Sequence, residues 1–312
     1  MKKVFIIKLC FAFLAAQFIG LHVAKAQEQS LVSQYMFNML NVNPAYAGNR
    51  EVGNLNFLIR NQWVSMPGAP VFGSLSYDVR KENSNVGLGV QVYSNRIGIE
   101  KTTGANALYS YRVPFKKSYL SIGMSFGILN YQANFTQSNS FQSGDPVLQQ
   151  NVNGFLPAAG FGMLYAREKW YIGLSSPSLL TTKLNAQGKA DVTSAGKNGH
   201  YFLNTGYIVD ASEYVKLKPS LLVKVVSGAP VQYDINMNAW FGGVFGAGVS
   251  YRTEDAILGM LELQLSPQLR MGYAYDYSNA RLVSYNRGSH EFMLRYEFGS
   301  KQEGRVASPR YY

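Results

Sequence analysis

The chain is poor in the residues that carry most thiol and metal chemistry. It has one cysteine and three histidines in 312 residues. Cys10 lies in an N-terminal segment that we expect to be removed, which leaves no thiol for disulfides or covalent catalysis. His200 and His290 follow that segment, but their spacing is not that of a zinc site. We predict no catalytic residue, no metal site and no cofactor.

Long apolar runs are missing after residue 26. Lys2 and Lys3, the mostly apolar stretch 4–21 and the Ala24-Lys25-Ala26 ending are typical of a secretory signal peptide, with cleavage after Ala26. No apolar run of the roughly 18 residues that a membrane helix needs follows. The chain is therefore exported, and any membrane crossing must use strands.

Acidic residues are fewer than basic ones, and the formal net charge is +11. The predicted signal peptide holds four lysines and no acid, so residues 27–312 keep a charge of +7. The basic residues are scattered, and an exported chain meets no nucleic acid, so we predict none as a partner. Outer-membrane lipid, acidic partners and internal ion pairs are the expected counterparts.

The abundant feature is alternation of polar and apolar residues with a period of two. In 120–128, apolar side chains take the even positions and Ser or Gly the odd ones, which no helix would produce. Fourteen segments follow this pattern: Val52–Gln62, Val71–Arg80, Asn85–Tyr93, Thr103–Val113, Tyr119–Leu129, Leu156–Ala166, Trp170–Ser176, His200–Val209, Val215–Val226, Val231–Trp240, Val244–Arg252, Ala256–Leu265, Leu269–Tyr277 and Gly288–Phe298.

These segments have the length that a membrane barrel requires. A strand of about 10 residues, tilted by about 40°, covers the roughly 25 Å of the apolar band. We predict an all-β fold: a transmembrane, antiparallel, up-and-down barrel of about fourteen strands at residues 52–298, integral in the outer membrane. The connections 130–155, 177–199 and 278–287 are long and odd-numbered, so we place them outside and both termini in the periplasm.

The inner face is expected to carry mixed charges and small residues. Mixed charges fit either a pore or pairs that brace the wall, and we favour the braces. Glycines on one face of several strands would let something pack against the wall: Gly87, Gly89, Gly123, Gly127, Gly160, Gly162, Gly246 and Gly248. A narrow or plugged lumen is the resulting prediction.

Two stretches go beyond barrel patterning. Residues 27–51 form a predicted N-terminal periplasmic segment or plug with a motif of Gln34, Tyr35, Phe37, Asn38, Asn43, Pro44, Ala45, Tyr46 and Gly48. Pro44 disfavours a helical Asn43, and Gly48 can supply a positive φ, so a fixed turn should lead into the first strand. The last strand carries an expected assembly signal, Phe292, Leu294, Tyr296 and Phe298, before a basic periplasmic tail at 299–312.

With Gly-Ser-His-Glu at 288–291 and Ser-Pro-Arg-Tyr-Tyr at 308–312, these motifs resemble the PorP/SprF family of type IX secretion system membrane proteins. The resemblance implies an outer-membrane barrel. Some members belong to the core machinery with a periplasmic lipoprotein ring. Others are thought to hold the C-terminal domain of a cell-surface adhesin.

Our leading hypothesis is a non-enzymatic barrel that binds the C-terminal sorting domain of a type IX cargo, such as a gliding adhesin, and retains it at the surface. The expected contacts in the long loops are Tyr131, Phe135, Phe141, Leu179, Leu180, Lys183, Tyr285 and Arg287. The alternative is a constitutive subunit that docks the periplasmic lipoproteins through basic inner turns and the tail. A diffusion pore is the third and weakest reading.

Overall fold

The computed structural model describes residues 32–50, 52–80, 83–137, 151–184, 190–194, 199–226, 229–253, 255–278 and 286–298. The predicted signal peptide, the C-terminal tail, Phe141 and Tyr285 lie outside the described residues. Within the described ranges, no helix has the length and apolar character that would span a membrane.

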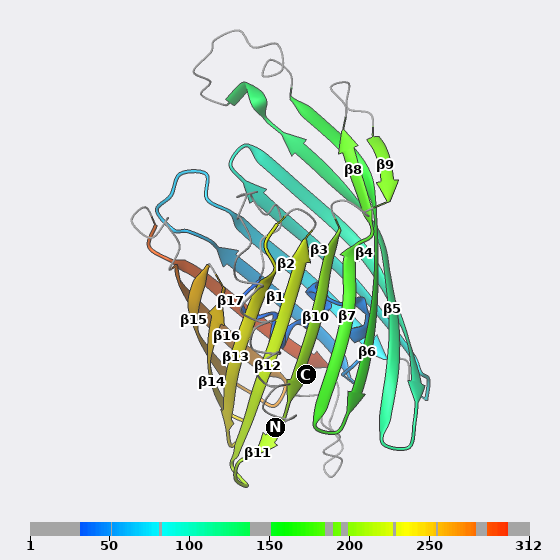
Figure 1. The fold of residues 1–312 in the computed structure, drawn as a ribbon, viewed down its shortest axis with the longest axis vertical. Helices are drawn as coiled ribbons and strands as arrows, with labels where there is room; N and C mark the ends of the chain where they lie inside the picture. Colours follow the sequence, from blue (N-terminus) through cyan, green and yellow to red (C-terminus); the bar gives the residue numbers. More distant parts are fainter. Residues whose placement is uncertain are drawn as a thin grey trace, which may run out of the picture.

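A closed antiparallel sheet dominates the molecule (Figure 1). Its strands are β1 (Gly53–Asn61), β2 (Val71–Arg80), β3 (Val86–Ile97), β4 (Glu100–Pro114), β5 (Ser118–Ala133), β6 (Val152–Arg167), β7 (Trp170–Ser178), β10 (His200–Tyr207), β11 (Val209–Asp210), β12 (Val215–Val226), β13 (Gln232–Phe241), β14 (Phe245–Arg252), β15 (Ala256–Gln264), β16 (Leu269–Ser278) and β17 (Ser289–Phe298).

Each strand pairs with its neighbour in sequence, and two further contacts close the ring. β1 pairs with β17, and β10 pairs with β12. β11 continues β10 after Ile208, so the ring has fourteen strands. The predicted fourteen-stranded up-and-down barrel is confirmed.

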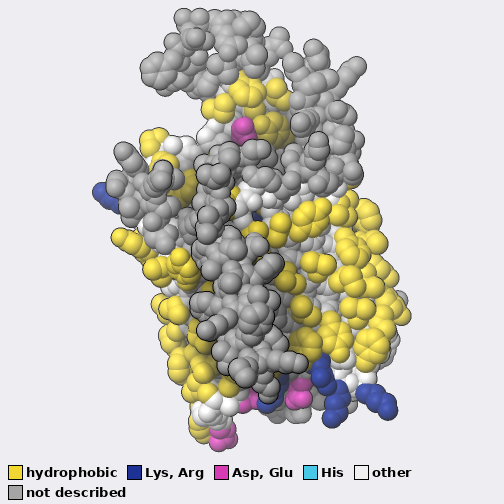
Figure 2. All heavy atoms as spheres, viewed as in Figure 1, with side chains coloured by type: hydrophobic (Ala, Val, Ile, Leu, Met, Phe, Trp, Pro, Cys, Tyr) yellow, Lys and Arg dark blue, Asp and Glu magenta, His cyan; other side chains and the backbone are white. Residues whose placement is uncertain are grey.

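The alternation of side chains places the apolar face outside. On β13, Asp234, Asn236 and Asn238 are buried, whereas Ile235 and Met237 point outward with 57% and 46% of their surface exposed. Figure 2 shows apolar side chains along the sides of the barrel and charged ones gathered at its lower end. This arrangement suits lipid around the barrel and polar contacts within it.

The barrel has two unlike mouths. At the long-loop mouth lie the connections 62–70, 134–151, 179–199 and 279–288, and at the short-turn mouth lie 81–85, 115–117, 168–169, 242–244 and 265–268. The expected parity of long and short connections is thus observed. Two odd-numbered connections are short. The β3–β4 connection, predicted as a loop between Tyr93 and Thr103, is a tight turn at Gly98 and Ile99, and the β14–β15 connection spans only 253–255.

The wall is much taller on one side than on the other. β4, β5 and β6 have 15, 16 and 16 residues, against 8 in β10 and β14. The sequence prediction ended β5 at Leu129 and began β6 at Leu156, because the additional pairs, such as Asn130 with Phe155 and Gln132 with Asn153, mix polar and apolar residues and do not continue the alternation of 120–128. A separate hairpin, β8 (Leu180–Leu184) with β9 (Ala190–Ser194), lies close to β6 at the top of Figure 1.

The side of the barrel that faces lipid generates a first prediction. Ile235 lies near the middle of β13 and points outward. Ile235→Arg should lower the free energy of unfolding by about 2–4 kcal/mol, because a cation near the bilayer midplane is poorly solvated. Urea unfolding of the barrel from lipid vesicles measures the change. Ile235→Leu is the control and should unfold as the wild type does; equal stability of the Arg variant would contradict the outward assignment.

Candidate functional site

The lumen of the barrel is occupied by the chain's own N-terminal residues. We call residues 32–50 the lumenal segment. Near the long-loop mouth, the Ser33 and Gln34 backbone N–H groups donate to the two oxygens of Glu291, each at 2.7 Å. Near the short-turn mouth, the Gly48 N–H donates to Asp78 Oδ2 at 2.9 Å. The segment therefore runs through the barrel from one mouth to the other.

Three short 3-10 turns shape this segment: η2 (Tyr35–Phe37), η3 (Met39–Asn41) and η4 (Pro44–Tyr46). Asn43 caps η4: its backbone is extended, and its side chain accepts a hydrogen bond from the Ala45 N–H at 2.9 Å. Gly48 has a φ of +63°. The turn expected from Pro44 and Gly48 is therefore present, and it directs the chain out of the lumen toward β1.

Glycines in the wall make room for the segment at four places. One of them, Gly272, is not among the eight predicted glycines, and a Cβ atom there would collide with the side chain of Gln34. A Cβ atom added at Gly123 would collide with the backbone of Ala45, one at Gly87 with the carbonyl of Ala47, and one at Gly162 with the side chain of Asn43. The other five of the eight predicted glycines, at 89, 127, 160, 246 and 248, contact residues of the wall itself. Among the eight, the prediction that small residues admit a packed guest holds for Gly87, Gly123 and Gly162 only.

Serines of the wall satisfy the backbone of the segment. The hydroxyls of Ser175, Ser121 and Ser110 donate to the carbonyl oxygens of Val42, Ala45 and Ala47, at 2.9, 2.8 and 2.7 Å. A buried segment outside a sheet needs such partners, because each unpaired carbonyl would lose its hydration without compensation. The Ser and Gly alternation of strands such as β5 thus has a second purpose, which is to cradle another piece of chain.

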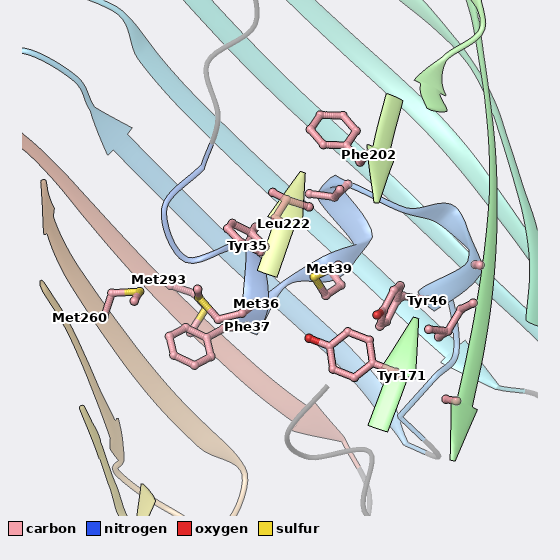
Figure 3. Close-up of a cluster of buried hydrophobic side chains, with 14 of the residues drawn as sticks. Tyr35, Met36, Phe37, Met39, Tyr46, Tyr171, Phe202, Leu222, Met260 and Met293 are labelled. Atoms are coloured by element: carbon pink, nitrogen blue, oxygen red, sulfur yellow. The ribbon is translucent and has the colours of Figure 1, made fainter. Parts of the chain in front are cut away.

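The motif side chains bind and pack inside the barrel, and all nine of them are buried. Tyr35 Oη accepts from Asn236 at 2.6 Å, and Tyr46 Oη accepts from Asn204 at 2.9 Å. The Phe37 ring meets Trp240 edge to face, with 6.3 Å between centroids. Figure 3 shows Tyr35, Phe37, Met39 and Tyr46 in one cluster with Tyr171, Phe202 and Leu222 of the wall.

Ion pairs hold the segment at the long-loop end. Arg60 contacts Asp276 at 2.7 Å and Glu291 at 3.4 Å, and its Nη1 also donates to the Ser33 hydroxyl at 2.6 Å. Arg252 pairs with Asp234 at 2.9 Å beside this group. The interior charges of this end are thus paired, as the bracing hypothesis expects, and the segment's first residues share the network.

A second set of charges holds the short-turn end. Arg50 pairs with Glu297 at 2.7 Å. Arg80 donates to the Gly48 carbonyl at 2.7 and 3.0 Å, and Arg112 donates to Asn49 Oδ1 at 2.7 Å. Both arginines therefore contact the segment itself. Charged groups grip it at each mouth, and apolar side chains fill the space between.

The expected assembly signal lies on the lipid face of the closing strand. Phe292 and Leu294 are half-buried, and Tyr296 and Phe298 are 40% and 46% exposed. Phe298 lies opposite Gly53 at the start of β1, so this strand closes the ring at the short-turn mouth. Recognition of these residues during barrel assembly stays a prediction.

The predicted loop residues fall into two groups. Tyr131 lies in β5 rather than in a loop, Phe135 in a 3-10 turn (η5, Phe135–Gln137) that follows it, and Leu180 and Lys183 in β8. Leu179 precedes β8, and its N–H donates to the Ala159 carbonyl at 2.7 Å. Arg287 lies apart from them, where its N–H donates to Val64 O at 2.9 Å. Sequence reasoning missed Phe155, which is 71% exposed on β6.

A scan against protein-family models matches residues 24–296 to the type IX secretion system membrane protein PorP/SprF. The chain belongs to this family. The resemblance carried by the two motifs is confirmed, and the barrel is that of a secretion-system membrane protein. The comparison with curated proteins gave no match.

Solved barrels are similar only in outline. The Ralstonia pickettii toluene transporter TbuX has 10% identity and a TM-score of 0.48, covering 84% of this chain and 93% of that one. The Acinetobacter baumannii outer membrane protein Omp33 has 8% identity and a TM-score of 0.45, covering 80% and 100%. The CymD monoaromatic hydrocarbon channel has 12% and 0.46, covering 87% and 94%. Identities and TM-scores as low as these do not indicate a function.

The close fit between the wall glycines and the lumenal segment generates a second prediction. Gly123→Ala should lower the free energy of unfolding by about 1–3 kcal/mol, because the new methyl group overlaps the backbone of Ala45. Urea unfolding measures this, and planar-bilayer recording tests whether the displaced segment lets current pass. Gly259→Ala is the matched control: it is also a strand glycine, with open space around its Cβ position. Similar behaviour of the two variants would contradict tight packing.

The grip at the long-loop end generates a third prediction. Glu291→Gln removes a buried charge that faces Arg60 and turns an N–H group toward backbone donors. It should lower the free energy of unfolding by about 3–5 kcal/mol. Asp210→Asn breaks only exposed pairs with Lys169 and Lys216 and should cost at most about 1 kcal/mol. A small effect of Glu291→Gln in the same urea series would disprove the proposed anchoring.

Proposed function

We propose that this barrel binds the C-terminal sorting domain of a type IX cargo, such as a gliding adhesin, at its long-loop mouth and retains that cargo at the outer membrane. The observation that carries the proposal is the tall wall formed by β4, β5 and β6. A 16-residue strand, at about 3.3 Å per residue and a tilt of about 40°, spans roughly 40 Å. About 15 Å of it is therefore not needed to cross the apolar band.

The tall wall offers the features of a protein contact surface. Phe155 is 71% exposed on its outer face, and Leu179, whose N–H donates to Ala159 of the same strand, is 37% exposed. Tyr131 and Phe135 lie at the upper end of β5, and the β8–β9 hairpin with Leu180 and Lys183 stands next to β6. Exposed aromatic and aliphatic anchors on an ordered strand fit a protein partner, because they lose little conformational freedom on binding.

The filled lumen supports docking over conduction. A porin keeps a water-filled channel, whereas here the lumenal segment runs from Glu291 to Asp78 and buries its motif side chains in the wall. The diffusion pore therefore has the weakest support of the three functions. The chain's own residues occupy the interior of this secretion-system barrel, so its two mouths remain for contacts with partners.

The alternative function, docking of periplasmic lipoproteins, draws on the short-turn mouth. Lys116 and Lys117 are exposed in the β4–β5 turn and remain candidates for contact with an acidic partner. Other basic residues proposed for this role are engaged: Arg80 binds the Gly48 carbonyl and Lys169 pairs with Asp210. The available basic surface is smaller than the sequence suggests, so we rank this function second.

The experiment that tests the proposal follows a cargo C-terminal domain fused to a fluorescent protein. Phe155→Asp with Leu179→Asp should shift most of the reporter from the cell surface to the medium, about a tenfold loss of retention, because both anchors become charged. Lys116→Glu with Lys117→Glu is the opposite-mouth control and should keep retention. Loss of retention in the control variant alone would contradict our proposal. So would normal cargo binding by the Phe155 and Leu179 variant together with loss of lipoprotein co-purification in the control alone, and in either case docking at the short-turn mouth would replace the proposal.

A further inference from the structure

The upper part of β6 has one edge without a strand partner. β6 pairs with β5 along all of 152–167. On its other side it pairs with β7 only at 161–166, and one more bond follows, from the Leu179 N–H to the Ala159 carbonyl at 2.7 Å. Beyond that bond, no described residue forms a backbone hydrogen bond with the side of 152–158 that faces away from β5. We call residues 152–158 the free edge.

The β8–β9 hairpin lies near β6 but does not complete its sheet. β8 follows β7 along the chain, yet the strand that pairs with it is β9 (Figure 1). Within the described residues, neither strand of the hairpin joins the ladder of β6. An unpaired edge inside the hydrocarbon of the membrane would be costly, because nothing there can pair with it. The free edge therefore fits the part of the tall wall that rises beyond the apolar band.

The register of β6 determines which backbone groups point toward the free edge. In an antiparallel sheet, successive residues direct their N–H and C=O groups to alternate sides of the strand. The pairing of β6 with β5 has no shift in register, and the Ala159 carbonyl points away from β5, to Leu179. Asn153, Phe155 and Pro157 alternate in step with Ala159. The free edge thus offers the carbonyls of these three residues and the N–H groups of the first two.

The free edge lacks the features that commonly prevent the addition of a strand. Natural edge strands are protected by charged side chains, by bulges or by a covering element. Residues 152–158 contain no charged residue, and their ladder with β5 is regular. Pro157 has no N–H group to donate, but it is placed on the edge side, where it leaves the ladder with β5 intact. The side chains of Asn153, Phe155 and Pro157 are all exposed on one face.

We infer that the free edge binds an extended β-strand of the cargo domain, which joins the sheet beside β6 and packs an apolar side chain on Phe155. This inference deepens the proposed function and rests on it. A strand is the occupant that fits, because the unpaired groups form a row of backbone donors and acceptors with the two-residue spacing of a sheet ladder. Phe155 supplies selectivity, since aromatic and β-branched neighbours across two strands stabilise their pairing.

Amide hydrogen exchange, measured by NMR on the barrel in lipid nanodiscs, tests whether the edge is open. In the barrel alone, the N–H groups of Asn153 and Phe155 should exchange much faster than those of Leu156 and Ala158, which face β5. The cargo C-terminal domain should slow the first pair by at least about tenfold and leave the second pair unchanged. Slow exchange of Asn153 and Phe155 without cargo, because the hairpin or a second copy covers them, would overturn the inference.

A pair of double variants tests the hydrogen bonds. Asn153→Pro with Phe155→Pro removes both N–H groups of the edge and no donor to β5. Asn153→Ala with Phe155→Ala is the matched control, because it removes the same side chains and keeps both N–H groups. The proline variant should bind the fluorescent cargo domain about tenfold more weakly than the alanine variant, since two hydrogen bonds are lost. Equal affinities of the two variants would also overturn strand addition.

Failure of the proposed function gives a different result. If cells with the wild-type barrel do not bind the cargo domain, the proposed function is wrong. If they bind it and both double variants bind equally well, the function stands and strand addition is wrong. The exchange experiment uses the wild-type chain, so it decides the matter even if the proline variant does not fold.

Discussion

The structure depends on one requirement, that the backbone polar groups of the lumenal segment must find partners inside the barrel. A ring of fourteen strands is too wide for its own side chains to fill. The lumenal segment fills it, but it brings carbonyl and N–H groups that cannot join the sheet. Serine hydroxyls at 110, 121 and 175 and the carboxylates of Asp78 and Glu291 supply the missing partners. Barrel and segment therefore specify each other.

Charges act at the ends of this arrangement and apolar packing in its middle. The clusters around Arg60 and Arg80 grip the segment near the two mouths, and the aromatic cluster of Tyr35, Phe37 and Tyr46 lies between them. Buried ion pairs add little net stability, but a wrong position of the segment would leave charges unpaired, which is costly. The ion pairs thus fix the segment's register, and the packing supplies most of the stabilisation.

The asymmetry of the wall separates a lipid-facing part from a partner-facing part. Strands of 8 to 10 residues, such as β10, β13 and β17, have the length that the membrane requires. β4, β5 and β6 continue beyond it, and the β8–β9 hairpin stands beside β6. The long-loop mouth therefore gathers the long connections and the tall sheet.

The sequence by itself determined the fourteen strands, their inward and outward faces, the parity of the connections and the family, because period-two alternation and local turn chemistry are properties of neighbouring residues. It also marked the nine motif residues, although not their partners. Only the tertiary structure decided that Asn43 meets Gly162, that Ser33 and Gly48 lie near opposite mouths, and that Tyr131 belongs to a strand. Those contacts join residues far apart in the chain or extend strands beyond the regular alternation, and neither leaves a periodic signal in the sequence.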